Sequence, residues 1–148
     1  MNLFDSLAIS GSALLAERQR SEVIAANMAN AQTTHTEAGG PYRRREVLFE
    51  TLGASSFRLA LASSGESHGP TAGSVRISDV VDDPSPALMR YEPSHPDANK
   101  EGYVAYPAIN PTAEMVDLMD SVRAYQLNAS AVAATKQMIQ QAIGILKS

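Results

Sequence analysis

Three histidines are the side chains of this sequence best suited to ligate a metal ion or to act as a general base. His35, His68 and His95 lie 33 and 27 residues apart. None has a second histidine or a cysteine at the short spacing with which one element supplies two metal ligands. We therefore interpret all three as solvated loop residues, which predicts no metal site and no catalytic histidine.

Clusters of charged residues offer no better catalytic arrangement. Asp79, Asp82 and Asp83 lack the spacing and the closing glutamate of a calcium-binding EF-hand loop. The basic run 43–45 is followed directly by Glu46, and no glycines form a phosphate-binding loop. We interpret the run as exposed charge at the start of a strand. The sequence thus predicts no catalytic residues, no cofactor and no enzymatic activity.

The composition excludes further classes of protein. The 148 residues include 16 acidic and 12 basic side chains, a net charge of −4. This balance argues against a nucleic-acid-binding protein, which needs a basic face to meet the phosphates. The absence of cysteine excludes disulfides and thiolate metal sites. No apolar run exceeds about four residues, far short of the roughly 20 that span a bilayer. The amino-terminal residues carry no basic cluster, so we expect no cleaved secretory signal.

Proline and glycine divide the chain into three segments. All eight prolines and seven of the nine glycines lie between Gly39 and Pro111. The middle of the chain is therefore rich in turns, and the flanks are almost free of helix-breaking residues. We expect residues 1–31 and 111–148 to form one discontinuous helical assembly domain. Residues 32–110 are expected to form a β-rich insertion with loops.

The carboxyl-terminal flank carries the clearest helix signals. Asn110 and Pro111 are residue types preferred at the N-cap and the first position of a helix, and Glu114 places negative charge in the first turn. A helix of this length would extend roughly 55 Å. Apolar residues recur at alternating spacings of three and four, as on the contact face of a coiled coil. Nine of the ten positions of this stripe are apolar, with Lys136 as the exception: Met115, Leu118, Val122, Tyr125, Ala129, Val132, Lys136, Ile139, Ile143 and Leu146.

A second long helix is predicted at the amino terminus and should end near Ala29. No proline interrupts residues 2–31, and most of them favour helix. Its stripe has the same spacing but is interrupted by Ser10, Glu17 and Ser21. Its apolar members are Leu3, Leu7, Leu14, Ile24 and Met28. Because both flanks carry such stripes, we expect the two helices to pair.

Four short apolar runs in the middle segment are predicted to be strands. Val75 and Ile77 alternate with polar residues, which is typical of a half-buried strand. Residues 63–73 and 82–101 are expected to be loops. The predicted strands are 45–50, 57–61, 74–78 and 102–106. The expected fold class is α+β, with long terminal helices paired as a coiled-coil-like bundle around a small, mostly antiparallel β insertion.

Two asparagines mark the end of the first helix. At a helix end, asparagine commonly caps or bonds nearby backbone. We expect at least one of the Asn27 and Asn30 side chains to bond backbone at this junction.

The sequence Gly39–Tyr42 is expected to form a rigid corner between the first helix and the insertion. Its two glycines permit positive φ, and Pro41 fixes its own φ. An aromatic ring that can pack favours a fixed angle over a swivel. We expect Tyr42 to bury its ring at the base of the helix pair, near Tyr103 or Tyr106.

Two motifs resemble the signature sequences of bacterial flagellar rod and hook proteins. The first comprises residues 25–34 and the extension Gly-Gly-Pro-Tyr-Arg-Arg at 39–44, which is similar to proximal rod proteins in particular. The second comprises the segments 102–107, 110–111, 114–119 and 123–126. The motif residues carried over from the resemblance are Asn27, Asn30, Gly39, Gly40, Pro41 and Tyr42. The resemblance covers about two thirds of the chain, and residues 51–98 show no clear resemblance.

The resemblance implies a structural subunit of the flagellar basal-body rod. Such proteins are exported through the flagellar type III apparatus without a cleaved signal, and they polymerise into the periplasmic rod that transmits torque. The implied partners are other rod proteins, the basal-body adaptor and copies of the chain itself, with no nucleic acid and no direct membrane span. The expected subunit interface consists of Leu3, Leu7, Leu14, Ile24, Met28, Met115, Leu118, Val122, Tyr125, Ala129, Val132, Ile139, Ile143 and Leu146.

Two other interpretations stay open. A soluble coiled-coil adaptor that displays the β insertion to one partner would be a monomer or a closed dimer. A rod subunit instead makes heterologous contacts that propagate into an open filament. An enzyme that uses one of the three histidines is a weaker alternative, and triple substitution of the histidines would test it.

Overall fold

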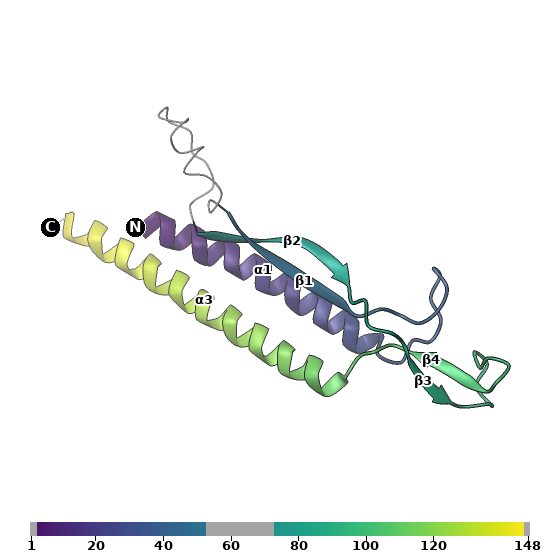
Figure 1. Cartoon of the computed structure of the whole chain (residues 1–148). Coiled ribbons are helices and arrows are strands. Elements are labelled where there is room, and N and C mark those ends of the chain that lie inside the picture. The colour runs from purple at the N-terminus through teal and green to yellow at the C-terminus, as the bar shows by residue number, and fades with distance from the viewer. Residues whose placement is uncertain (1–2, 53–72, 147–148) are drawn as a thin grey trace, which may run out of the picture.

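The computed structural model describes residues 3–52 and 73–146 as two long antiparallel helices and two short β-sheets (Figure 1). Helix α1 comprises Leu3–Ala29 and helix α3 comprises Pro111–Leu146. The chain termini lie at one end of the helix pair (Figure 1). The α+β class predicted from the sequence is confirmed. The strand predicted at 57–61 lies outside the described residues.

Asparagine side chains cap the carboxyl-terminal end of α1 and the amino-terminal end of α3. Both helix ends lie at the end of the helix pair opposite the chain termini (Figure 1). Asn110 accepts a hydrogen bond from the N–H of Thr112 at 3.0 Å, as an N-cap does. At the end of α1, Asn30 donates from Nδ2 to the carbonyl of Ala26 at 2.9 Å. The predicted helix boundaries at this end and the predicted bond from asparagine to backbone are confirmed. Neither helix, over the residues that are described, has the length and apolar content needed to cross a membrane.

The seam between α1 and α3 buries small polar residues. Its α3 side consists of buried Glu114, Ser121 and Thr135 and half-buried Leu118, Asn128, Val132 and Ile139. The hydroxyl oxygens of Ser21 and Ser121 lie 2.9 Å apart across the seam. Ser121 and Thr135 also donate to carbonyls of their own helix at 2.9 Å. These bonds satisfy the buried hydroxyls, so small polar side chains can line a close helix contact.

The seam differs from the predicted stripe at alternate positions. Met115, Val122 and Ile143 belong to the predicted stripe but are between 44% and 48% exposed in the single chain. Tyr125 is 43% exposed, whereas Ser121, one residue before Val122, is completely buried. The predicted stripe is therefore divided: Leu118, Val132 and Ile139 are half-buried in the seam, whereas the larger members beside it stay exposed in the single chain. The close contact selects small side chains, and the larger apolar ones lie beside it.

Strands β1 (Arg45–Leu52) and β2 (Ser74–Asp82) form an antiparallel sheet that lies along α1 (Figure 1). Both strands are predicted from the sequence, and each extends beyond its predicted bounds. Val75 and Ile77 are half-buried while Arg76 and Ser78 are exposed, which confirms the predicted alternation. The N–H of Val75 donates to Oγ of Ser12 on α1 at 3.0 Å. Helix α1 therefore packs against both this sheet and α3.

Strands β3 (Leu88–Tyr91) and β4 (Tyr103–Tyr106) form a second antiparallel sheet beyond the helix pair (Figure 1). This sheet, which we call the arm, packs against none of the other described elements. The prediction of a strand at 102–106 is confirmed. The expectation that 82–101 is all loop is wrong at β3. The prolines that favour loop flank this four-residue strand and do not interrupt its pairing.

Candidate functional site

The side-chain amide of Asn27 pairs with the first peptide group of β1 as a neighbouring strand would. Its Nδ2 donates to the carbonyl of Arg45 at 2.9 Å, and its Oδ1 accepts from the N–H of Arg45 at 2.9 Å. The pairing satisfies two backbone groups at the outer edge of the strand. Asn27 is only 1% exposed. It therefore fixes the position at which β1 meets α1.

Glu114 connects the same amide to α3. Its carboxylate is 1% exposed and accepts from Asn27 Nδ2 at 3.1 Å and from Arg44 Nε at 2.6 Å. We call the cluster of Asn27, Arg44 and Glu114 the clasp. It joins the end of α1, the residue before β1 and the first turn of α3. A buried carboxylate is costly unless it is paired and hydrogen-bonded, and the clasp supplies both conditions.

The guanidinium of Arg44 faces three carboxylates. Besides Glu114, it binds Glu46 and lies 3.6 Å from Asp117. Burial alone would lower the pKa of Arg44, but the hydrogen bond and the charge of Glu114, together with Glu46, raise it above its ordinary value. The positive end of the α3 macrodipole also favours negative charge in its first turn, where Glu114 lies. The site is thus a charged structural joint.

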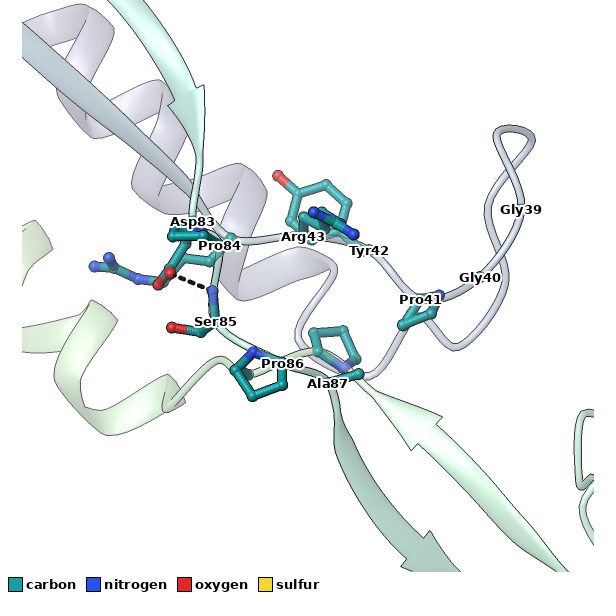
Figure 2. A pocket seen from close by; sticks show the side chains of 13 residues that line it. Gly39, Gly40, Pro41, Tyr42, Arg43, Asp83, Pro84, Ser85, Pro86 and Ala87 are labelled. Atoms are coloured by element: carbon teal, nitrogen blue, oxygen red, sulfur yellow. Dashed lines mark hydrogen bonds between the residues drawn. The ribbon is translucent and has the colours of Figure 1, made fainter.

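The loop after α1 leaves the helix and returns to the clasp. Gly39 and Gly40 have φ angles of 87° and 77°, which confirms the predicted use of positive φ. The N–H of Thr36 bonds the carbonyl of Gly40 at 2.9 Å, and the N–H of Tyr42 bonds the carbonyl of Thr33 at 3.0 Å. The glycines lie in the outer part of this narrow loop (Figure 2). The predicted rigid turn is therefore a pinned loop, and the corner between helix and sheet is made by the clasp.

Tyr42 joins this loop to the clasp through its hydroxyl. The hydroxyl donates to Oδ1 of Asn27 at 3.2 Å. The expectation that the ring lies near Tyr103 or Tyr106 is wrong, because both of those rings pack within the arm. The backbone bonds of the loop instead direct Tyr42 toward α1.

Replacing Tyr42 with phenylalanine is expected to lower the free energy of unfolding by about 1 kcal/mol, the usual contribution of one hydrogen bond. Burial raises the pKa of Tyr42 above its ordinary value of 10.0, and only the protonated hydroxyl can donate to Asn27. Tyr42 therefore stabilises the fold fully below about pH 10 and loses this contribution as the pH rises through its raised pKa. Urea denaturation on both sides of that pH measures the effect.

The matched control for this prediction is Tyr91→Phe. The Tyr91 side chain is 65% exposed, and its hydroxyl makes no hydrogen bond within the described parts of the chain. The control should keep the stability of the native chain at neutral pH. Equal stability of the Tyr42→Phe and Tyr91→Phe proteins would show that the hydroxyl bond to Asn27 contributes nothing.

A hollow of about 300 Å³ lies beside the clasp, between the returning loop and the segment that links the two sheets (Figure 2). Pro84 and Pro86 line it on one side, and Pro41 lines it on the other. The hydroxyl and the N–H of Ser85 both donate to the Asp83 carboxylate, the N–H to Oδ1 at 2.8 Å, and these bonds lower the pKa of Asp83 below its ordinary value. Proline, glycine and alanine make up most of the lining of the hollow.

The structure does not bring the candidate metal ligands together. His35 is exposed in the loop after α1, His95 lies in the arm, and His68 lies outside the described residues. Within residues 3–52 and 73–146, no group of three metal-ligating side chains could hold an ion.

The predicted interface residues differ in their burial. On α1, Ile24 is buried at 6% and Leu3 is 40% exposed. On α3, the exposed members are those described above, and Leu146 is the last residue of the helix. The half-buried members are Leu7, Leu14, Met28, Leu118, Ala129, Val132 and Ile139.

The sequence analysis finds Asn27 but misses its two charged partners. It interprets Arg44 as part of an exposed run and Glu114 as a charge placed to suit the helix dipole. Both interpretations rely on neighbours along the chain, whereas the clasp joins residues that are 70 and 87 positions apart. A useful signal was that each of the two sequence motifs contains part of the clasp, Asn27 and Arg44 in the first and Glu114 in the second.

Comparison with known proteins defines the class of this chain. The family described as "Flagellar basal body rod FlgEFG protein C-terminal" matches residues 100–145, which hold β4 and most of α3. This match shows that the carboxyl-terminal part of the chain is similar to flagellar basal-body rod proteins.

Relatives matched over the full length are more specific. The chain is 41% identical to the flagellar basal-body rod protein FlgC of Bacillus subtilis, over 99% of the chain and 100% of that protein. It is 35% identical to FlgC of Borreliella burgdorferi over 99% of each. It is 34% identical to FlgC of Salmonella typhimurium, over 94% of the chain and 92% of that protein. The chain belongs to the FlgC family of flagellar basal-body rod proteins, which confirms the resemblance seen in its motifs.

Proposed function

We propose that this chain is a structural subunit of the flagellar basal-body rod, and that α3 carries most of its contacts with neighbouring subunits. The observation that carries the proposal is that the 36-residue α3 packs against α1 and against no other described element. The exposed apolar side chains of α3 include Met115, Val116, Met119, Val122, Tyr125, Leu127, Met138 and Ile143. An exposed apolar surface of this extent is typical of a face that a partner covers.

The small core of the single chain supports the same proposal. Among the residues described, the buried apolar side chains are Ala16, Ile24, Val104 and Ile109. Such a core offsets little of the conformational entropy lost when two long helices order. Neighbouring helices that cover the exposed apolar residues would supply the missing stabilisation.

We assign assembly to residues 1–31 and 111–148, and the apolar stripes of both helices to the subunit interface. An apolar hollow of about 410 Å³ between the helices supports this assignment. Ala25 lines it on the α1 side, and Leu118, Val122 and Tyr125 line it on the α3 side. A side chain from a neighbouring helix would fit this hollow. Residues 32–110 form the insertion that the clasp attaches to the helix pair.

The finer role we propose is that of a proximal rod subunit in the periplasm. The relatives are named basal-body rod protein FlgC, and we infer a place for this chain in the same structure. Other rod proteins, the basal-body adaptor and further copies of the chain would be its neighbours in a helical assembly that transmits torque. Export through the flagellar type III apparatus without a cleaved signal completes the proposal. We propose a structural rather than a catalytic role, because the relatives are named as basal-body rod proteins.

The test is replacement of the chain in a flagellated cell. Deletion should abolish motility, a plasmid copy should restore it, and the chain should be recovered in purified basal bodies. The purified chain alone should be partly unfolded by circular dichroism, and it should gain helix signal when related rod subunits are added. A fully helical monomer or closed dimer that is absent from basal bodies would favour the soluble adaptor and contradict the proposal.

A further inference from the structure

The arm is attached to the rest of the molecule by two short connectors. The first, residues 83–87, leads from β2 to β3, and the second, residues 107–110, leads from β4 to α3. The N–H of Asp83, at the start of the first connector, donates to the carbonyl of Arg44 at 2.7 Å. Within the described chain, no backbone hydrogen bond joins residues 84–109 to the remainder. Backbone pairing alone therefore does not set the direction of the arm.

A hollow separates the first connector from the loop that follows α1. It is the hollow of about 300 Å³ beside the clasp, and residues 39–44 of the loop and residues of both connectors line it (Figure 2). Residues 84–87 are exposed, whereas Ile109 in the second connector is only 7% exposed. Proline fixes φ at Pro84 and Pro86, but ψ of both residues stays variable. The base of the arm is therefore anchored at its second connector and can bend at its first.

One side-chain hydrogen bond crosses from the loop after α1 to the turn of the arm, residues 92–102. The hydroxyl of Thr34 donates to Oδ2 of Asp97 at 2.7 Å. The other hydrogen bonds of residues 88–106 within the described chain stay inside the arm. A hydrogen bond to an ionised carboxylate is roughly twice as strong as one between neutral groups. The bond from Thr34 is thus the polar contact that joins the turn of the arm to the helix pair.

Both partners of this bond are held in place by their own segments. On the loop, Thr34 follows Thr33, whose carbonyl accepts from the N–H of Tyr42 at 3.0 Å. On the arm, the N–H of Asp97 donates to Nδ1 of His95 at 3.1 Å. Each end of the bond is therefore fixed relative to its own part of the molecule. A bond between two such parts determines the angle between them.

We propose that the bond between Thr34 and Asp97 is a latch that fixes the angle of the arm to the helix pair. When the bond is broken, the arm tilts about its second connector, and the exposed first connector bends beside the hollow. Figure 1 shows that the loop after α1 and the arm extend past the same end of the helix pair, so the latch acts between neighbouring segments. The latch is a property of the single chain and does not depend on the proposed function.

Distances between two spin labels test the latch, because the native chain has no cysteine and two introduced cysteines carry the only labels. Lys100→Cys labels the arm and Gln126→Cys labels the middle of α3, and both native side chains are exposed. The distance distribution should be narrow while the latch is intact. Thr34→Val removes the hydroxyl and keeps the shape of the side chain. It should raise the population of the tilted arm about fivefold, the usual effect of one hydrogen bond, and Asp97→Ala should broaden the distribution equally.

Two controls separate the latch from general unfolding. Gln19→Cys with Gln126→Cys places both labels on the helix pair, and this distribution should be the same in the native chain and in both variants. The samples contain sucrose, which favours the folded chain. Thr36→Val is the matched control in the loop, because the Thr36 hydroxyl donates to the carbonyl of Gly40 at 3.2 Å and does not reach the arm. It should leave the distance to the arm unchanged.

Three results would overturn the latch. Identical arm distributions with and without the bond would show that packing around the fully buried Val104 holds the arm. Equal broadening by Thr36→Val and Thr34→Val would assign the effect to the loop as a whole. The double variant Thr34→Val with Asp97→Ala breaks the same single bond, so it should be no broader than either variant alone. A broader distribution in the double variant would show that the two residues act separately.

Discussion

The Arg44→Met variant is expected to lose about 3–5 kcal/mol of folding free energy, the usual result of removing one partner from a buried ion pair. The change leaves the carboxylate of Glu114, which is 1% exposed, with the Asn27 amide as its remaining donor in the clasp. Domains are stable by only about 5–15 kcal/mol, and this chain has a small apolar core. Urea denaturation followed by circular dichroism should therefore show a large fall in the midpoint.

Two further variants identify the clasp as the cause. Arg43→Met is the matched control, because Arg43 is the neighbouring residue and is exposed. It should change stability by no more than about 0.5 kcal/mol. The double variant Arg44→Met with Glu114→Leu removes both charges, and it should recover much of the loss because no unpaired carboxylate is then buried. Equal losses from Arg43→Met and Arg44→Met would show that the clasp is not responsible.

The ends of both helices could be predicted because their signals are local. The N-cap at Asn110 and the proline after it act on the first turn of α3, and Asn30 acts on the last turn of α1. The alternation of Val75 and Ile77 with polar residues predicted the first part of β2, residues 74–78. Each signal lies within a few residues of the structure that it determines.

The face of α3 that meets α1 could not be read from apolar spacing alone. Apolar periodicity marks the side chains that favour burial. It does not show whether the same chain or a neighbouring chain will cover them. In this molecule Ser121 is buried against α1, while Val122 stays 44% exposed. A contact between close helices favours small side chains, including small polar ones. A search for apolar spacing alone omits these polar residues.

The clasp could not be predicted from the sequence for a different reason. Asn27, Arg44 and Glu114 are brought together only when three segments fold onto one another. Spacing along the chain contains no record of such a contact. Strand β3 was predicted as loop because prolines lie on both sides of it. Prolines that favour a loop also permit a short strand between them.

The Val122→Asp variant is expected to separate folding from assembly. Val122 is 44% exposed in the single chain, so an aspartate there stays hydrated and should change the stability of the isolated chain by less than about 1 kcal/mol. In the proposed rod, a neighbouring helix covers this position, and burying an unpaired carboxylate costs several kcal/mol. The variant should therefore be made and exported normally, yet be missing from purified basal bodies, and the cells should be non-motile.

Ser121, the residue before Val122, is expected to respond to aspartate in the opposite way. Ser121 is completely buried, and its hydroxyl oxygen lies 2.9 Å from that of Ser21. Ser121→Asp should therefore destabilise the isolated chain itself by about 3 kcal/mol or more, because the seam would bury a charge without a partner. Urea denaturation of the two purified variants, beside counts of the chain in basal bodies, measures both effects. Normal incorporation of Val122→Asp would exclude Val122 from the subunit interface. Equal unfolding of both variants would place Val122 on the seam with α1.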